Sequence, residues 1–290
     1  MHKFILHNGQ IHEASSKLLS PGQVGALSGW GVFSTIRIFD GVLFAFERHW
    51  ARMKKDAEIM RVPFPADPRQ VEDSLLELVE ANHASNAALR IAVVRNRGGI
   101  WEGPGIKRDF DVVALTTNVR NWGQGVKLGI AAQARHAQSR FAGVKILSWA
   151  ENLVLYEDAH SQGYDEVVLL NERGEVSECT SANIFCSNGN RVLTPPLVSG
   201  CLPGVTREVL LTEVRVAGIS IEERVLTPTD LEAADEVFIT STTRQLLPVL
   251  SIEGLAIRTK GHAREKLQAA FSEYVDRYVA AHRGAGTKTR

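Results

Sequence analysis

The chain has 290 residues, of which 33 are basic and 33 are acidic, so its formal net charge at pH 7 is zero. A hydrophobic content of 44% is typical of a folded protein and excludes a disordered or fibrous one. Because balanced charges create no field that would attract a polyanion, we expect neither nucleic acid nor an anionic membrane surface as a partner.

The first part of the chain is predicted to mix strands with helices. Residues 32–39 and 42–46 are rich in β-branched and aromatic side chains, and the Asp40-Gly41 pair between them suits a two-residue hairpin turn. From Glu47 onward apolar residues recur at helical spacing, which predicts a helix directly after the hairpin. The same criteria indicate an apolar run at 4–6, a helix that Asp67 caps with Pro68 in its first turn, and strands at 88–94 and 111–116.

The aperiodic segment 119–125 is predicted to link an N-terminal α+β domain (1–118) to a C-terminal domain (126–282). In the second domain strand-like segments alternate with helical ones, which indicates an α/β or α+β lobe with its own sheet. The strand-like segments are 126–131, 166–170, 184–186, 219–221 and 237–240, and the helical ones are 152–161, 205–216 and 263–279. Residues 283–290 are small, polar and basic, and they are predicted to form a flexible tail.

Three cysteines, Cys179, Cys186 and Cys201, match neither a disulfide framework nor a zinc-ribbon spacing. We therefore expect reduced thiols and no metal site. The first ten residues lack the apolar stretch of a signal peptide, and no run reaches the roughly 18 apolar residues that span a bilayer. The sequence thus predicts a cytoplasmic protein.

The usual hydrolase, zinc-protease, Walker A and Rossmann signatures are incomplete or missing. The candidate nucleophile is Lys145. Its apolar neighbours favour a depressed pKa, and a neutral lysine can attack a carbonyl carbon. The alternative is a strand whose lysine extends to water, and Lys127 has a similar setting. Flanking polarity alone does not decide between these two interpretations.

Six segments, in order, resemble the class IV, fold-type IV family of pyridoxal-phosphate aminotransferases. They are 29–41 with 47–52, 143–145 with 163–168, 176–185, 194–196, 202–207, and 236–243 with 248–249. The resemblance covers about residues 3 to 255. It implies two domains of mixed α and β structure: a smaller N-terminal α+β lobe, and a larger C-terminal lobe with helices and a β-barrel-like sheet. It also implies a homodimer.

The resemblance assigns roles to residues that pyridoxal 5'-phosphate would need: an amine, a carboxylate for the ring nitrogen, and donors for the phosphate. Lys145 is implied as the amine and as the base that moves the substrate Cα proton. Glu178 is implied as the partner of the ring nitrogen. The implied phosphate ligands are Arg52, the helix start at Val205 and Thr206, and the hydroxyls of Ser241 and Thr242.

The substrate residues differ from those of individual branches of the family. Branched-chain aminotransferases have Phe-Glu-Gly-Ile-Arg where this chain has Phe33-Ser-Thr-Ile-Arg37, and their pocket tyrosines are replaced by Ser28 and Ala150. Arg95 and Arg97 partly match the carboxylate-binding segment of D-amino-acid aminotransferases, which also has a histidine. The candidate substrate residues are Phe33, Arg37, Arg95, Arg97 and Thr243.

The resemblance therefore predicts transfer of an amino group between a hydrophobic, branched-chain-like amino acid and a 2-oxo acid. The alternatives are an aminodeoxychorismate lyase, which eliminates pyruvate, a D-amino-acid transaminase, and an inactive cofactor-binding homologue. The joint presence of Lys145, Glu178 and Arg52 favours an enzyme over an inactive homologue.

Overall fold

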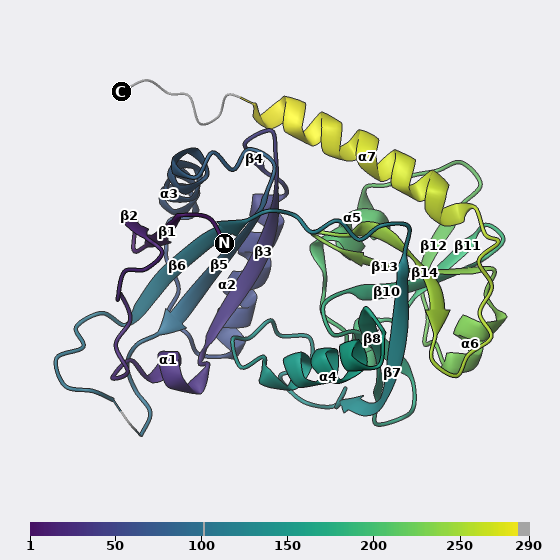
Figure 1. The fold of residues 1–290 in the computed structure, drawn as a ribbon, viewed down its shortest axis with the longest axis horizontal. Coiled ribbons are helices and arrows are strands. Elements are labelled where there is room, and N and C mark those ends of the chain that lie inside the picture. Colours follow the sequence, from purple (N-terminus) through teal and green to yellow (C-terminus); the bar gives the residue numbers. More distant parts are fainter. Residues whose placement is uncertain (101, 284–290) are drawn as a thin grey trace. The chain divides into compact units, whose positions relative to one another are not determined.

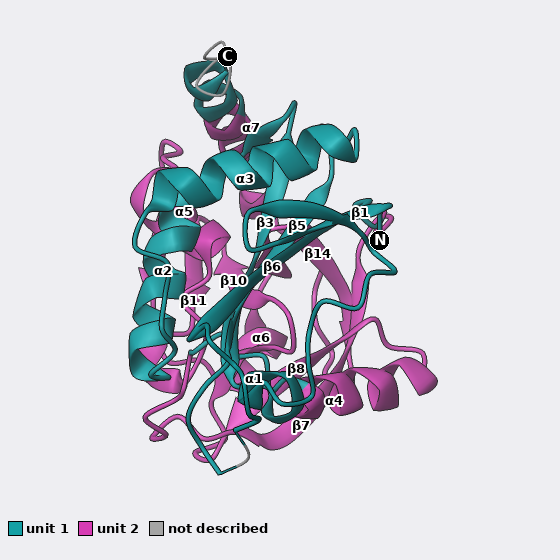
Figure 2. Ribbon diagram, turned by 90° about the vertical axis from the view of Figure 1, so that its left-hand side faces the viewer, with its two compact units in different colours: residues 1–120, 144–149, 276–290 teal, residues 121–143, 150–275 magenta. Residues whose placement is uncertain are grey.

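The computed structural model describes residues 1–100 and 102–283. The chain divides into two units (Figures 1 and 2). Unit 1 consists of residues 1–120, 144–149 and 276–290, and unit 2 of residues 121–143 and 150–275. Apart from Arg283, the predicted tail at 283–290 lies outside the described residues. Within the described part, each helix is too short or too polar to cross a membrane.

Unit 1 contains an antiparallel six-stranded sheet in the order β2-β1-β6-β5-β3-β4. Its strands are β1 (Phe4–His7), β2 (Gln10–Glu13), β3 (Gly31–Phe39), β4 (Val42–Leu43), β5 (Ala88–Arg95) and β6 (Phe110–Thr117). Its helices are α1 (Val24–Ser28), α2 (Phe46–Ile59) and α3 (Pro68–Ala81). The side chain of Asp67 accepts hydrogen bonds from the backbone N–H groups of Arg69 and Gln70, so the predicted helix cap is confirmed.

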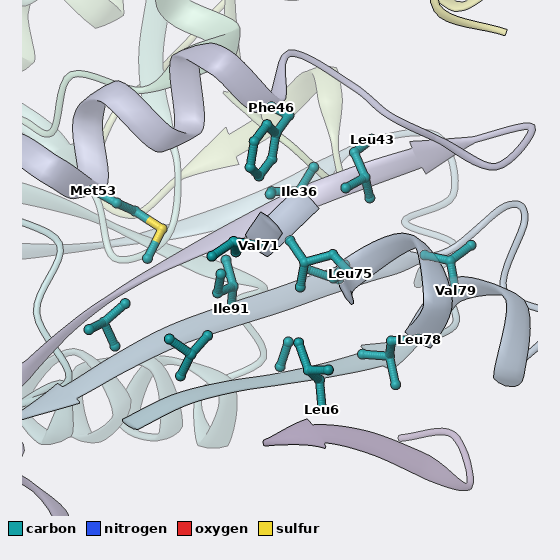
Figure 3. Close-up of a cluster of buried hydrophobic side chains, with 14 of the residues drawn as sticks. Leu6, Ile36, Leu43, Phe46, Met53, Val71, Leu75, Leu78, Val79 and Ile91 are labelled. Atoms are coloured by element: carbon teal, nitrogen blue, oxygen red, sulfur yellow. The ribbon is translucent and has the colours of Figure 1, made fainter. Parts of the chain in front are cut away.

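The core of unit 1 lies between one face of this sheet and the helices α2 and α3 (Figure 3). Alternate residues of a strand point to the same face, which brings Ile36 of β3 and Ile91 of β5 into this core. Met53 of α2 and Leu75 of α3 meet them from the helices. Each such side chain stabilises the fold by about 1.5–3 kcal/mol.

The hairpin at Asp40-Gly41 is confirmed, since Phe39 pairs with Val42. The predicted second strand is too long, however, because β4 ends at Leu43. Ala45 adopts a left-handed conformation with φ 54°, which ends the extended backbone and starts α2. The helix predicted over 205–216 is also too long, because it ends at Thr212.

Unit 2 contains an eight-stranded sheet in the order β12-β11-β10-β13-β14-β7-β8-β9. Its strands are β7 (Val126–Arg135), β8 (Glu166–Asn171), β9 (Val176–Cys179), β10 (Asn183–Asn188), β11 (Arg191–Thr194), β12 (Ser220–Glu223), β13 (Glu236–Ser241) and β14 (Gln245–Ile252). β9 lies at one edge of the sheet. After a connection of only three residues the chain enters β10, which is the third strand from the other edge. The backbone N–H of Cys179 donates to Ala182 O at 2.7 Å across this short connection. The sheet must therefore curl towards a barrel, as expected.

The helices of unit 2 are short apart from two. They are α4 (Ala150–Ser161), the 3-10 turn η1 (Leu197–Ser199), α5 (Val205–Thr212) and α6 (Pro228–Ala233). The last helix, α7 (Ala263–His282), belongs to unit 2 up to residue 275 and to unit 1 from residue 276. α5 packs against β12 and β13, and α4 packs against β7 and β8.

Residues 144–149 return to unit 1 between two stretches of unit 2 and lie along the first half of β3. Ile146 forms an antiparallel bridge with Val32. Phe33 N–H donates to Lys145 O at 3.2 Å, and Leu147 N–H donates to Gly31 O at 3.0 Å. These bonds fix the backbone of Lys145 against the strand that contains Phe33.

Candidate functional site

Lys145 is half-buried in unit 1, with its amine over an aromatic ring. Its Nζ lies 4.6 Å from the ring centroid of Phe33, within the range of a cation–π contact. Its backbone N–H donates to Asp56 Oδ2 of α2 at 3.3 Å. The backbone of the lysine is thus held by β3 on one side and by α2 on another.

Arg52 lies on α2 in the same unit and shares a polar cluster with Lys145. Arg52 Nη2 donates to Ser34 Oγ at 2.7 Å, and Ser34 Oγ is 2.8 Å from His49 Nδ1. Burial, together with the positive charges of Arg52 and Lys145, holds the pKa of His49 well below its usual value. His49 is therefore neutral at pH 7 and adds no competing positive charge.

Asp56 provides the negative charge of this cluster and was missed by the sequence analysis. Its side chain is almost completely buried, and burial raises its pKa to about 6 against the opposing effect of Arg52 and Lys145. The four-residue spacing from Arg52 puts both on one face of α2. This spacing in a helix that was predicted to bind phosphate could have identified Asp56 from the sequence.

Glu178 lies on β9 in unit 2 and is held by two donors. Arg135 Nε is 3.1 Å from Glu178 Oε1, and Leu202 N–H donates to Oε2 at 3.0 Å. Arg135 also donates from Nη2 to Asn152 Oδ1 at 3.1 Å. The carboxylate is nearly buried and therefore has a fixed orientation.

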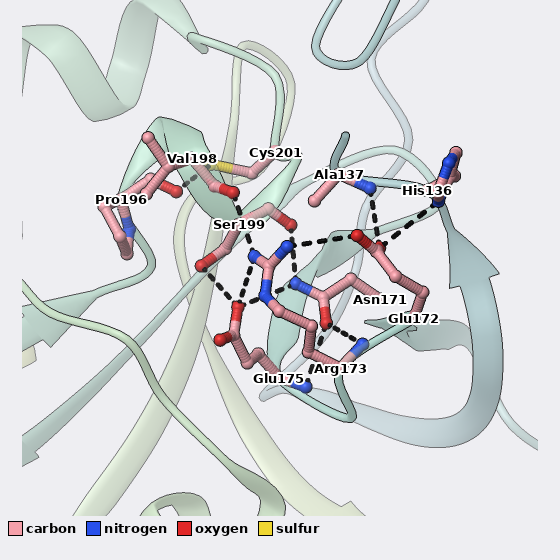
Figure 4. Close-up of polar contacts among 10 residues, drawn as sticks. All are labelled: His136, Ala137, Asn171, Glu172, Arg173, Glu175, Pro196, Val198, Ser199 and Cys201. Atoms are coloured by element: carbon pink, nitrogen blue, oxygen red, sulfur yellow. Dashed lines mark hydrogen bonds and ion pairs between the residues drawn. The ribbon is translucent and has the colours of Figure 1, made fainter. Parts of the chain in front are cut away.

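A hydrogen-bonded turn supports the segment that leads to Leu202 (Figure 4). Glu175, between β8 and β9, accepts from Arg173 Nη2 at 2.7 Å and from Asn171 Nδ2 at 2.8 Å. Arg173 Nη2 also donates to Val198 O at 3.1 Å, and Asn171 Nδ2 to Ser199 O at 3.2 Å. The hydrogen bonds from Arg173 and Asn171 lower the pKa of Glu175 to about 2, so this support stays charged at neutral pH.

The start of α5 is close to the loop that follows Glu178. Asn183 Nδ2 donates to Leu202 O at 2.8 Å, and a side chain at Gly204 would overlap Asn183 Oδ1. Only glycine fits this close approach. Gly204 caps α5, so the N–H groups of Val205 and Thr206 lie in the first turn, where the helix dipole favours an anion.

Ser241 and Thr242 lie where β13 turns into β14. Asn183 pairs with Thr240, the residue before Ser241, and α5 packs against β13. Unit 2 therefore brings together Glu178, the start of α5 and this turn. Among the described residues Ser241 Oγ is buried and has no hydrogen-bond partner, so it is poised to bind a ligand atom. Thr243 is half-buried in the same turn.

Three candidate substrate residues of unit 1 have other contacts. Arg37, at the far end of β3 from Lys145, donates to Ala87 O at 2.9 Å. Arg95 donates to Arg97 O at 2.7 Å and lies over Trp30. Arg97 pairs with Glu102 and Asp109 at 3.3 and 3.5 Å.

Arg90 is a candidate functional residue that the sequence analysis missed. Its guanidinium carbon lies 4.2 Å from the same Phe33 ring that Lys145 approaches, and 5.9 Å from the ring of Trp149. Phe33 and Trp149 meet edge to face with centroids 6.2 Å apart. The alternation of β5, with Leu89 and Ile91 facing the core, puts Arg90 on the opposite face. An arginine within an otherwise apolar strand was the signal.

Comparisons with known proteins give the chain's family and fold. The family model described as amino-transferase class IV matches residues 31–252. A D-alanine aminotransferase of Bacillus licheniformis is 30% identical over 254 residues, which cover 87% of this chain and 89% of the relative. A branched-chain-amino-acid aminotransferase of Salmonella typhimurium is 28% identical, covering 84% and 83%. The solved branched-chain aminotransferase of Escherichia coli superposes with a TM-score of 0.86 at 24% identity, covering 95% of both chains.

Proposed function

The chain belongs to the class IV aminotransferase family, and on this premise we propose that it moves an amino group between a hydrophobic, branched-chain-like amino acid and a 2-oxo acid. As a member of this family it is a pyridoxal-phosphate-dependent transaminase, so the predicted enzyme class and cofactor are confirmed. The family match does not favour the lyase, the D-amino-acid transaminase or an inactive homologue. The position of the Lys145 amine over the ring of Phe33, which Arg90 also approaches, is the observation that supports the proposal most directly.

The residues of the two units fit the chemistry of the cofactor. Bound pyridoxal phosphate supplies an aldehyde and an electron-withdrawing ring. Lys145 offers the amine for the aldehyde, and Glu178 offers a fixed carboxylate that can accept a hydrogen bond from a protonated ring nitrogen. The phosphate would be held by the unpartnered hydroxyl of Ser241, by Thr242, by the first turn of α5 and by the planar guanidinium of Arg52.

Lys145 would have a second role as a base. Its amine is the group that would take and move the proton of the substrate Cα. The backbone bonds to Phe33 and Asp56 keep the lysine in place while its side chain moves.

Substrate recognition is proposed to involve Phe33, Trp149 and Arg90. Trp149, which packs edge to face on the buried ring of Phe33, offers apolar surface for a hydrophobic side chain. Arg90 lies over the ring of Phe33, and burial lowers its pKa without removing its charge. A guanidinium in this position suits a carboxylate of the amino acid or of the 2-oxo acid.

Absorption spectra of the purified protein, with and without Lys145→Ala, test the assignment. After incubation with pyridoxal phosphate, we expect the wild type to show an absorption band at a longer wavelength than the free cofactor. After borohydride reduction, the cofactor should stay covalently attached to the protein. Lys145→Ala should show neither. A wild type without the band would contradict the proposal.

A panel of L- and D-amino acids then tests substrate and stereochemistry. We expect branched-chain L-amino acids to convert the cofactor to its amine form fastest, and turnover to require an added 2-oxo acid. Release of pyruvate without any 2-oxo acid would instead identify a lyase, and a faster reaction with D-alanine would identify a D-amino-acid transaminase.

We further propose a homodimer in the cytoplasm. The helix α4 exposes Leu153 and Val154, and its apolar residues lie on all sides of the helix. Apolar residues that are exposed in the single chain in this way are typical of a surface that a second subunit covers. The three cysteines are free and buried, which suits a reducing compartment.

A further inference from the structure

A buried ion pair in unit 2 has no role in the function proposed so far. Glu166 Oε2 and Arg244 Nη2 are 3.0 Å apart, and their side chains are 0% and 4% exposed. Glu166 begins β8, whereas Arg244 lies in the turn between β13 and β14. Removing two ions from water costs several kcal/mol each, so such a pair persists only when further hydrogen bonds satisfy it.

Those further bonds come from the loop that follows Glu178. Ser181 Oγ donates to Glu166 Oε2 at 2.5 Å, and Thr180 Oγ1 donates to the other carboxylate oxygen. Arg244 Nη1 donates to Ser181 O at 3.2 Å and contacts Ser181 Oγ at 2.9 Å. The guanidinium carbon also lies 4.1 Å from the ring centroid of Trp122, which fixes the plane of the group.

The pair therefore connects two segments that contain proposed cofactor ligands. Thr180 and Ser181 are the second and third residues after Glu178, and Arg244 is the second residue after Thr242. The network also runs back to Glu178, because Asn152 Nδ2 donates to Thr180 O at 2.7 Å. Asn152 binds Arg135, and Arg135 binds Glu178.

We propose that the Glu166–Arg244 pair is a positioning element that sets the separation between Glu178 and the Ser241–Thr242 turn. The proposal rests on the proposed function, in which Glu178 contacts the cofactor ring and the turn contacts its phosphate. Neither Glu166 nor Arg244 touches the cofactor in this scheme. The pair keeps the acceptor for the ring and the donors for the phosphate in place before binding, which lowers the cost of ordering the site on binding.

The small net contribution of a buried ion pair to stability distinguishes a positioning role from a purely stabilising one. Apolar side chains of similar volume often stabilise a protein interior as well as a buried ion pair does. A pair kept only for stability would therefore be replaceable without effect on ligand geometry. A positioning pair, by contrast, is needed for the directional bonds that Arg244 makes with Ser181 and Glu166.

The test compares the affinity of the apo-protein for pyridoxal phosphate with its affinity for pyridoxal, which lacks the phosphate. The variants are Arg244→Met, Arg244→Lys and the double variant Glu166→Gln/Arg244→Met, which leaves no unpaired buried charge if the single variant fails to fold. Arg191→Met, which removes an exposed ion pair with Glu222 in the same sheet, is the matched control. Circular dichroism and thermal melts establish that each variant is folded.

We expect the wild type to bind pyridoxal phosphate much more tightly than pyridoxal, and this ratio to shrink about tenfold or more in folded Arg244→Met or in the double variant. Arg244→Lys keeps the charge but loses the planar fork, and it should give an intermediate ratio. An unchanged ratio in a folded variant that lacks Arg244 would overturn the inference. A wild type that binds both ligands equally would overturn the phosphate assignment itself, and with it this inference.

Discussion

Asp56 makes the stability of the protein depend on pH. Its folded-state pKa of about 6 lies above the ordinary value of 3.8, so the folded state holds the proton more tightly than the unfolded state. The stability is therefore highest when Asp56 is protonated, and it decreases as the pH rises from about 4 to about 6. A difference of roughly two pKa units corresponds to about 3 kcal/mol.

Asp56→Asn should remove this dependence. We expect the variant and the wild type to have similar free energies of unfolding at pH 4, and the variant to be more stable by about 3 kcal/mol at pH 7. Urea unfolding at several pH values measures the difference. Asp40→Asn is the control of opposite sign, because bonds from Asn86 and Arg283 lower the pKa of exposed Asp40. Compared with the wild type, Asp40→Asn should have a lower free energy of unfolding at pH 7 and the same free energy of unfolding in acid.

The three thiols should be unreactive in the folded protein. Burial raises the pKa of Cys186 and of Cys201 to about 12, and burial with the nearby Glu166 raises the pKa of Cys179 well above its usual value. Because the thiolate is the reactive form, a thiol reagent should label none of them rapidly at pH 7.5 and all three after unfolding. Ser15→Cys, at an exposed position, supplies the positive control. Rapid labelling of the native wild type would mean that the interior of unit 2 opens frequently.

The role of Lys145 could be predicted from the sequence only in part. Its apolar neighbours resemble those of Lys127, and only the order of the surrounding segments distinguished the two. Its contacts with Phe33 and Asp56 could not be predicted, because they join residues far apart in the chain. Arg90 and Asp56 were overlooked since each looks like an ordinary surface charge on a strand or helix.

At the scale of elements, Gly204 links the geometry of α5 to that of β10. A methyl group at this position would force Asn183 to move and to lose its bond to Leu202 O. We expect Gly204→Ala to destabilise the protein by about 1–3 kcal/mol and to weaken the binding of pyridoxal phosphate. Urea unfolding and a cofactor titration measure the two effects.

Gly129→Ala is the matched control for this variant. Gly129 lies within β7, where an added methyl group would make ordinary contacts with Tyr164 and Ala159 at 3.4–3.5 Å. Its cofactor affinity should equal that of the wild type. If Gly204→Ala also binds the cofactor normally, the start of α5 has no part in phosphate binding.

The elements that could be predicted are those with a strong periodic pattern. α2, α3, β5 and β6 were predicted because their core faces repeat every three to four or every two residues. β9 and β11 were missed, since each has only four residues and is buried throughout or nearly so. Such short strands have no alternating pattern, and their pairing with distant strands decides their conformation.

At the scale of the whole molecule, the proposed homodimer can be tested by sedimentation equilibrium. The chain has a mass of 31.9 kDa, and we expect the wild type to sediment at about twice that mass. Leu153→Arg and Val154→Arg on α4 should shift the population towards the monomer, while Val225→Arg, at another exposed apolar position, should not. A monomeric wild type would contradict the proposal. The domain boundaries at 118–126 stay a prediction that limited proteolysis can test.

The return of residues 144–149 to β3 also orders the events of synthesis on the ribosome. β3 is complete at residue 39, and β5 pairs with one of its edges. Residues 144–149, which pair with the other edge along Gly31–Phe33, leave the ribosome only after residues 40–143. Until then the edge of this strand is open to pairing with other nascent chains. Lys145 therefore reaches its place late, and a truncated product that ends before it exposes an edge prone to aggregation.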